Sequence, residues 1–238
     1  MRRILPFTLT FILGSCCQSG PPERRIGPDI DPSCYAERYI DATDIAAFLA
    51  LSRTRLPRYG AMFRQAANAT GLDWRLLAAL AYQESQWDPL ATSPTRVRGM
   101  MMLTEDTADR LKVTNRLDAK QSIEAGARYL ALLRDDLPET VLEPDRTWLA
   151  LAAYNLGMGH LNGARAIARM IKRDPNHWNE MREVLPLLSE PDYYEKLISG
   201  QGRGGEAVIL VENVRVYYDV LSRVEVEGLD MSFSIPPR

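Results

Sequence analysis

One stretch of the sequence decides the fold: Leu72-Asp73-Trp74-Arg75-Leu76-Leu77-Ala78-Ala79-Leu80-Ala81-Tyr82-Gln83-Glu84-Ser85. Asp73 can cap a helix that begins behind it, because its carboxylate accepts hydrogen bonds from free backbone amides. Each helical residue turns by about 100°, so Glu84 falls within roughly 40° of both Leu77 and Leu80 on the helix surface. The stretch therefore predicts a helix over residues 73–86 that carries a carboxyl group on its apolar stripe.

The position of Glu84 indicates a candidate catalytic acid. A buried carboxylate is unfavourable unless it is paired or stays protonated. Pro89 and Pro94 bracket a segment that cannot continue the helix, so a cleft could open there. A carboxyl between apolar walls has a raised pKa and remains a proton donor near neutral pH, as cleavage of a glycosidic bond requires. The alternative is a glutamate that caps the helix end or pairs with Arg96 or Arg98.

The rest of the chain predicts an all-α fold. Helical patterns follow one another, and the apolar-polar alternation of strands is nearly absent. The expected helices cover residues 44–53, 57–69, 73–86, 104–111, 119–137, 146–156, 163–173, 178–188 and 207–223. Residues 200–205 include four glycines and are expected to form a flexible loop before the last helix.

The first residues have the features of a bacterial lipoprotein signal. Arg2 and Arg3 precede an apolar run over residues 4–13, which is too short to span a bilayer. The following Leu13-Gly14-Ser15-Cys16 resembles a lipobox, so Cys16 is the expected lipidated first residue. A conventional secreted protein with an unmodified Cys16 is the alternative.

These features divide the chain into four parts. Residues 1–15 are the expected signal peptide, and residues 16–34 form a tether rich in Pro, Gly and charge. Residues 35–230 are the expected catalytic domain, and residues 231–238 are a C-terminal tail. Cys17 and Cys34 could pair in an oxidising compartment, which the sequence does not decide.

Composition excludes several classes of protein. The chain is 46% hydrophobic and 25% charged, as is usual for a globular protein, and its net charge of -2 argues against a nucleic-acid partner. Its two histidines, His160 and His177, do not lie in a ligand-spaced cluster, so neither a metal nor a cofactor is expected.

Four ordered motifs resemble a known family. They are Ala81-Tyr82-Gln83-Glu84-Ser85, Ala91-Thr92-Ser93, Gly99-Met100-Met101-Met102-Leu103-Thr104 and Ala153-Tyr154-Asn155-Leu156-Gly157. Together they are similar to the soluble-lytic-transglycosylase domain, over about residues 59–221, and most similar to the catalytic module of the membrane-bound lytic murein transglycosylase F branch. The resemblance implies a lysozyme-like helical domain with a substrate cleft. It also implies a solute-binding-like domain before that module, for which residues 1–34 leave no room.

The resemblance also implies roles for individual residues. Glu84 would be the only catalytic acid and base. The substrate would be contacted by Ser85, Met101, Met102, Ala153, Tyr154, Asn155 and Tyr217. The simpler interpretation makes the methionines core residues and the two tyrosines buried helix residues with satisfied hydroxyls. Met102 departs from the glutamine that is commonest in the family at this position, which indicates altered sugar contacts.

The reaction that the resemblance implies is cleavage of peptidoglycan glycan strands without water. The bond between N-acetylmuramic acid and N-acetylglucosamine would be cut to leave a 1,6-anhydromuramoyl end. One alternative is a lysozyme-type hydrolase in which Asp88, Glu105 or Asp106 places a water. Another is a non-catalytic lipoprotein that binds peptidoglycan. The expected location is the periplasmic face of the outer membrane, held by the lipid, because Cys17 stands where an inner-membrane lipoprotein commonly has aspartate.

Overall fold

The computed structural model describes residues 40–223. The predicted signal peptide, the lipidation site Cys16, the possible Cys17–Cys34 pair, the tether and the C-terminal tail lie outside the described residues. The boundaries at residues 15, 34 and 230 therefore stay predictions.

The described residues form only helices and loops, so the predicted all-α fold is confirmed. No strand occurs between residues 40 and 223, where isolated bridges join Thr92 with Arg98 and Arg98 with Leu103. The helices are α1 (Ala42–Thr54), η2 (Leu56–Arg58), α2 (Gly60–Thr70), α3 (Trp74–Ser85), α4 (Glu105–Arg110), α5 (Ala119–Asp135), α6 (Asp145–Leu156), α7 (Met158–Met170), α8 (Trp178–Val184), η3 (Leu185–Ser189), α9 (Pro191–Tyr194) and α10 (Gly204–Arg223).

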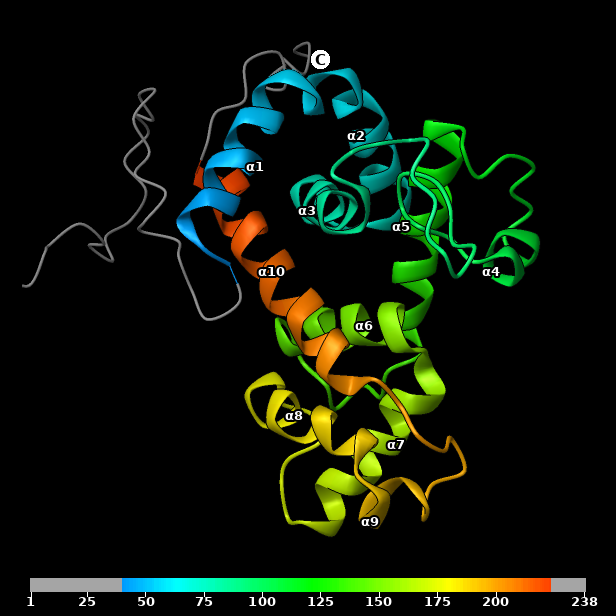
Figure 1. Ribbon diagram of the computed structural model, residues 1–238, viewed down its shortest axis with the longest axis vertical. Helices are drawn as coiled ribbons and strands as arrows, with labels where there is room; N and C mark the ends of the chain where they lie inside the picture. Colours follow the sequence, from blue (N-terminus) through cyan, green and yellow to red (C-terminus); the bar gives the residue numbers. More distant parts are fainter. Residues whose placement is uncertain (1–39, 224–238) are drawn as a thin grey trace, which may run out of the picture.

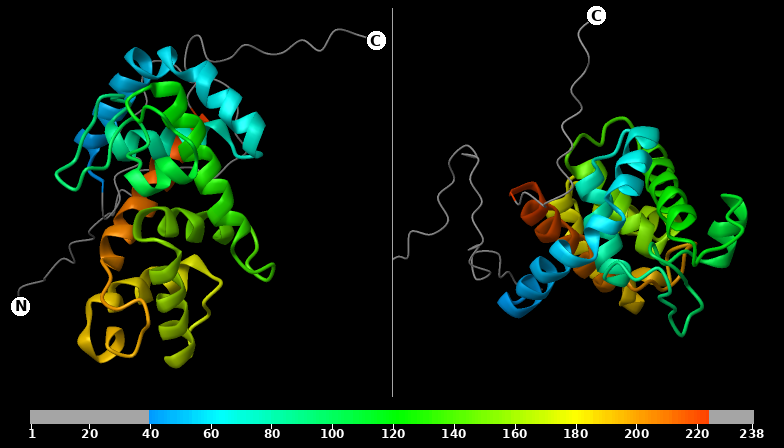
Figure 2. Two further views of the ribbon diagram at one scale, coloured as in Figure 1. Left: turned by 90° about the vertical axis from the view of Figure 1, so that its right-hand side faces the viewer. Right: turned by 90° about the horizontal axis from the view of Figure 1, so that it is seen from above.

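The helices are arranged in two tiers joined by α10 (Figure 1). α1, α2, α3 and α5 form the upper tier, with α3 enclosed by the others. α7, α8 and α9 form the lower tier, and α6 lies between the tiers. α10 runs from the lower tier along α6 to α3 and makes its most extensive contacts with these two helices. The left view of Figure 2, turned by 90° about the vertical axis, shows the same division.

Helix α3 is the buried centre of the upper tier. Asp73 caps it by accepting a hydrogen bond from the amide of Arg75 at 2.8 Å. Leu77 and Leu80 are fully buried on it. Gln86 ends the helix with a left-handed φ of 53°. Glu84 therefore stands in the last turn of α3, where the chain leaves the core.

Two helix starts were predicted too late by three residues or more. α7 begins at Met158 and α10 at Gly204, whereas the sequence predicted starts at residues 163 and 207. Gly163 lies inside α7 at a close contact with another segment, since a Cβ there would come within 2.6 Å of Ser199 Oγ. A Cβ on Gly204 would overlap the carbonyl oxygen of Leu185. These glycines permit close packing of neighbouring segments and do not interrupt the helices.

Candidate active site

The Glu84 carboxyl is partly exposed in the last turn of α3. No hydrogen bond or ion pair joins it to another residue within the described part of the chain, so the alternative of pairing with Arg96 or Arg98 is wrong. Burial alone raises the pKa of Glu84 from its ordinary value of 4.5 to about 8. A carboxyl with this pKa is largely protonated at neutral pH and can donate its proton.

The three consecutive methionines form a tight turn next to Glu84. The amide of Met102 donates to the carbonyl of Gly99 at 3.0 Å, which closes a β-turn with Met100 and Met101 at its centre. Gly99 has a φ of 85°, and a Cβ there would overlap the carbonyl oxygen of Arg116. Only glycine fits this position, which explains why the turn begins there.

Ser85 connects this turn to α3. Its hydroxyl donates to the carbonyl of Met100 at 2.8 Å and also lies 3.1 Å from the carbonyl of Ala81. Since a hydroxyl has one proton, these two carbonyls share it. The Ser85 oxygen can then only accept a hydrogen bond from another molecule. Ser85 therefore fixes the turn relative to the end of α3.

Tyr154 of α6 contacts the same turn. Its hydroxyl donates to the carbonyl of Met101 at 2.8 Å, and its ring centroid lies 5.3 Å from that of Tyr129. The pKa of Tyr154 lies well above its ordinary value, first because of burial and then because of the nearby charge of Glu84. The structure thus gathers Glu84, Ser85, the methionine turn and Tyr154, which lie far apart in the sequence.

Three of the predicted substrate contacts have buried side chains. The side chains of Met101 and Ala153 are fully buried, and that of Tyr217 is 6% exposed. Tyr217 packs against Phe48 and Tyr82 with ring centroids 4.6 and 4.7 Å apart. Tyr82 precedes Glu84 by two residues, so this aromatic cluster lies on the opposite face of α3 from Glu84. These side chains are part of the core that packs beneath the site.

The other predicted contacts are reachable. Met102, Ser85 and Tyr154 are partly exposed, and Asn155 is exposed. Met102 has a left-handed φ of 45°, and its side chain is partly exposed, whereas those of Met100 and Met101 are buried. The core interpretation therefore holds for Met100 and Met101 and not for Met102.

The carboxylates considered for a hydrolase have other partners. Asp88 accepts a hydrogen bond from the amide of Leu90 at 2.9 Å, and Glu105 lies 3.9 Å from Arg116. Asp106 is exposed in the first turn of α4. A carboxylate close to Glu84 would raise its pKa by repulsion, yet burial is the one cause of that shift.

One residue of the site was missed by the sequence analysis. Ser122 of α5 is fully buried, and its hydroxyl accepts a hydrogen bond from the amide of Met101 at 3.1 Å. The only sequence signal is a serine, with Gly126 four residues later, on the inner face of an amphipathic helix. That pattern gives no indication of what the serine contacts.

Two further observations concern metals and membranes. Among residues 40–223, no group of three His, Cys, Asp or Glu side chains is placed to hold a metal ion. In the same part of the chain, no helix combines the length and the apolar character needed to cross a membrane.

Comparisons with known proteins show which family the sequence resembles. The family profile of the Transglycosylase SLT domain matches residues 61–177. The chain is similar to the membrane-bound lytic murein transglycosylase F of Methylobacillus flagellatus, with 55% identity over 191 residues, which cover 80% of this chain and 40% of that relative. It is 56% identical to the protein of the same name from Nitrosospira multiformis over 183 residues, which cover 77% of this chain and 38% of the relative. The chain thus spans about two fifths of the length of these curated relatives.

A solved structure has the same fold. The 70 kDa soluble lytic transglycosylase SLT70 from Escherichia coli aligns with a TM-score of 0.50 at 19% identity, over 72% of this chain and 25% of that chain. The all-α fold of residues 40–223 is that of a lysozyme-like domain. The chain belongs to the transglycosylase SLT domain family.

Proposed function

We propose that this chain is a lytic transglycosylase that cleaves the glycan strands of peptidoglycan, with Glu84 as its single acid and base. One observation carries the proposal: the Glu84 carboxyl is unpaired among the described residues, and burial raises its pKa to about 8. The relatives that share more than half of their aligned residues with the chain are named as enzymes of murein, which supports the substrate class.

The first step is transfer of the Glu84 proton to the oxygen that links N-acetylmuramic acid to N-acetylglucosamine. The bond from this oxygen to the anomeric carbon breaks as the acetamido oxygen of the same muramic acid forms a new bond to that carbon. The positive charge is then held within the substrate, so a second protein carboxylate is unnecessary.

In the second step, the Glu84 carboxylate removes the proton from the C6 hydroxyl of the muramic acid. The C6 oxygen bonds to the anomeric carbon, and the acetamido oxygen leaves. Glu84 regains its proton, and the product is a 1,6-anhydromuramoyl end. Water is not consumed, so the reaction is that of a lyase. Exposed Asn155 and the partly exposed Ser85, Met102 and Tyr154 are the side chains that we assign to sugar contacts.

We also propose that the chain is anchored to the periplasmic face of the outer membrane by a lipid on Cys16. The support is the signal-like segment ending in Leu13-Gly14-Ser15-Cys16 and the words "membrane-bound" in the names of the relatives. Metabolic labelling with a radioactive fatty acid tests this anchor. Wild type should take up the label and Cys16→Ala should not, whereas an unlabelled wild type would favour the conventional secreted protein.

The activity is tested by mass spectrometry of the soluble products released from purified peptidoglycan. Wild type should release anhydromuropeptides, and Glu84→Gln should release none. Glu105→Gln is the matched control, because Glu105 is 72% exposed and pairs with Arg116. Products with reducing ends from wild type would instead establish a hydrolase. Strand binding without any product would favour the non-catalytic peptidoglycan-binding protein.

A further inference from the structure

Two serine hydroxyls hold the opposite ends of one peptide unit in the methionine turn. The carbonyl of Met100 accepts the hydroxyl proton of Ser85 at 2.8 Å. The amide of Met101, which belongs to the same peptide unit, donates to the hydroxyl oxygen of Ser122 at 3.1 Å. Ser85 comes from α3 and Ser122 from α5, so the plane of this peptide is fixed from two helices.

The next carbonyl of the turn holds the tyrosine. The carbonyl of Met101 accepts the hydroxyl proton of Tyr154 at 2.8 Å. The amide bonded to Ser122 and the carbonyl bonded to Tyr154 belong to the same residue, so a displacement of the Met101 backbone would redirect this carbonyl. Ser122 therefore acts on Tyr154 through the backbone of Met101.

The inner face of α5 is shaped to receive Met101. Gly126 lies one helical turn after Ser122, on the same face. A Cβ at Gly126 would come within 2.7 Å of the Cβ of Met101, which is too close for any other residue without movement of the turn. Ser122 binds the Met101 amide while Gly126 leaves room for the Met101 side chain, so both features serve the same contact.

We propose that Ser122 is a positioning residue for the reaction: its hydroxyl sets the direction of the Met101 carbonyl, which holds the Tyr154 proton away from Glu84. This inference rests on the proposed role of Glu84. Ser122 lies outside the four motifs that carry the family resemblance.

The proton direction at Tyr154 has a chemical consequence. While the hydroxyl donates to Met101, its oxygen can only accept further hydrogen bonds, and it can therefore accept one from a protonated carboxyl. A hydroxyl released from Met101 could donate to the ionised Glu84 carboxylate. Donation to the charged form favours that form, which would weaken Glu84 as an acid at neutral pH.

The experiment compares Ser122→Ala with Ser52→Ala in the full-length chain. Ser52 of α1 is equally buried, and its hydroxyl donates to Leu49 in its own helix at 2.9 Å, so it controls for the loss of a buried hydroxyl. The readout is the initial rate of release of soluble muropeptides, measured as a function of pH. Ser122→Ala should reduce the rate about tenfold at neutral pH and move the alkaline limb of the profile to lower pH by about one unit. Ser52→Ala should leave both unchanged.

A double variant separates positioning from general destabilisation. On a Tyr154→Phe background no hydroxyl remains to be redirected, so adding Ser122→Ala should cause no further shift of the pH profile. An equal shift with and without Tyr154 would overturn the inference. A wild-type profile for Ser122→Ala would overturn it as well.

If Ser122→Ala does not fold, Ser122→Cys provides the test. The thiol is close in size to the hydroxyl and is a weaker hydrogen-bond acceptor. The pH profile of Ser122→Cys should therefore lie between that of wild type and the one expected for Ser122→Ala. A Ser122→Cys profile equal to that of wild type would count against the inference. Failure of the proposed function is a separate result, because wild type itself would then release no anhydromuropeptides.

Discussion

The hydroxyl of Tyr154 donates its proton to the carbonyl oxygen of Met101 at 2.8 Å. Because that proton is committed, Tyr154 offers only lone pairs to the neighbouring Glu84, whose charge raises the pKa of Tyr154. A lone pair favours a protonated carboxyl over an ionised one. Burial therefore keeps Glu84 in the form that can donate, and the Tyr154 hydroxyl, while it donates to Met101, does not oppose this.

The pH dependence of activity should follow the protonation of Glu84. The first step requires the protonated acid, so the initial rate should fall as pH rises through about 8. The measurement is the rate of release of anhydromuropeptides from purified peptidoglycan at a series of pH values, with binding of the strands measured in parallel. A rate that already falls near the ordinary value of 4.5 would show that Glu84 ionises as an exposed glutamate does.

Glu84 should also make the folded state less stable at high pH. Its folded pKa is about 8 and its ordinary value is 4.5, so the folded state holds a proton that the unfolded chain releases between these values. The contribution of protonated Glu84 to the stability of the folded state is fully present below pH 4.5 and is lost as pH rises to about 8. The free energy of unfolding should fall in this window by about 1.4 kcal/mol per pH unit from this group alone.

Denaturant titrations of wild type and Glu84→Gln measure this effect. Glutamine does not ionise, so the variant should gain stability relative to wild type between the two pKa values, and the difference should stay constant above them. Glu105→Gln is the control, because the exposed Glu105 has no comparable burial. Parallel stability curves for wild type and Glu84→Gln would contradict the burial of Glu84.

Periodicity and motif order were sufficient to predict the all-α fold and the apolar setting of Glu84. Both depend on neighbours within a few residues in the sequence, such as Leu77 and Leu80 on the same helix. The position of Tyr217 was beyond this reasoning, because its ring packs on Phe48 and Tyr82 from two other helices. A motif aligns residues in sequence and does not state which face of the core they occupy.

The missed role of Ser122 has a similar cause. Its hydroxyl binds the backbone of Met101, and a backbone amide has no side-chain identity that a sequence pattern could match. Gly163 and Gly204 misled the helix boundaries for a related reason, since glycine at a contact between helices resembles glycine at a helix end. Close tertiary contacts decided these positions.

Replacement of Gly126 by alanine should disturb the methionine turn. The added methyl would lie 2.7 Å from the Cβ of Met101, an atom that cannot move without the backbone. We expect a loss of about 1–3 kcal/mol in stability and reduced activity, because the turn holds both Ser85 and Tyr154.

Gly159 provides the matched control for this substitution. It also lies in a helix, α7, and a Cβ there would have no neighbour within 4 Å. Gly159→Ala should raise stability by about 0.4–1 kcal/mol, since alanine restricts the unfolded chain. Thermal unfolding and muropeptide release measure both variants, and equal stability of the two would argue against a tight fit between α5 and the turn.

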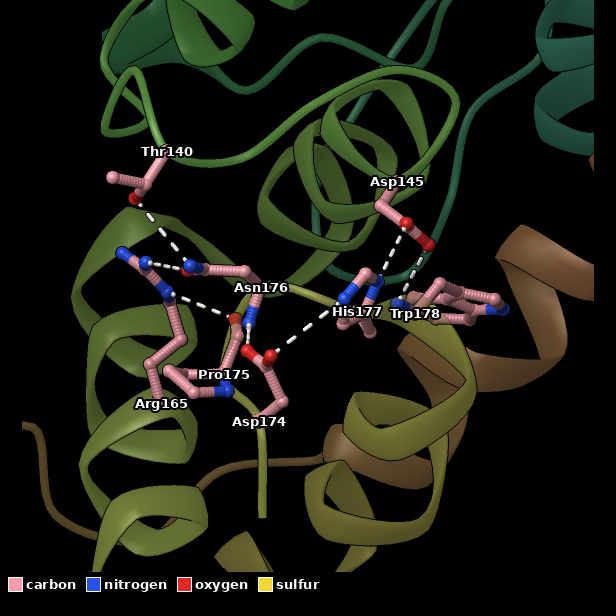
Figure 3. Close-up of polar contacts among 8 residues, drawn as sticks. All are labelled: Thr140, Asp145, Arg165, Asp174, Pro175, Asn176, His177 and Trp178. Carbon is pink, nitrogen blue, oxygen red and sulfur yellow. Dashed lines mark hydrogen bonds and ion pairs between the residues drawn. The ribbon is translucent and has the colours of Figure 1, made fainter.

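His177 should make the contact between α6 and α8 depend on pH (Figure 3). Its Nδ1 lies 3.0 Å from Asp145, the first residue of α6, and its Nε2 lies 3.6 Å from Asp174. The hydrogen bond with Asp145 is the largest cause that raises the pKa of His177 above 6.5. A raised pKa means that the stabilising effect is fully present below 6.5 and is lost as pH rises through the folded value.

His177→Gln should therefore lower the melting temperature at acidic pH and leave it nearly unchanged at alkaline pH, where wild-type His177 is already neutral. Asp145→Asn is the companion variant, because its amide oxygen can still accept the hydrogen bond that the amide of Trp178 donates to Asp145 at 2.8 Å. Since it removes the charge opposite His177, it should reduce the same pH dependence, and the double variant should add little to either single change. Independent, additive effects of the two substitutions would mean that the two side chains do not act as a pair at the junction of the two helices.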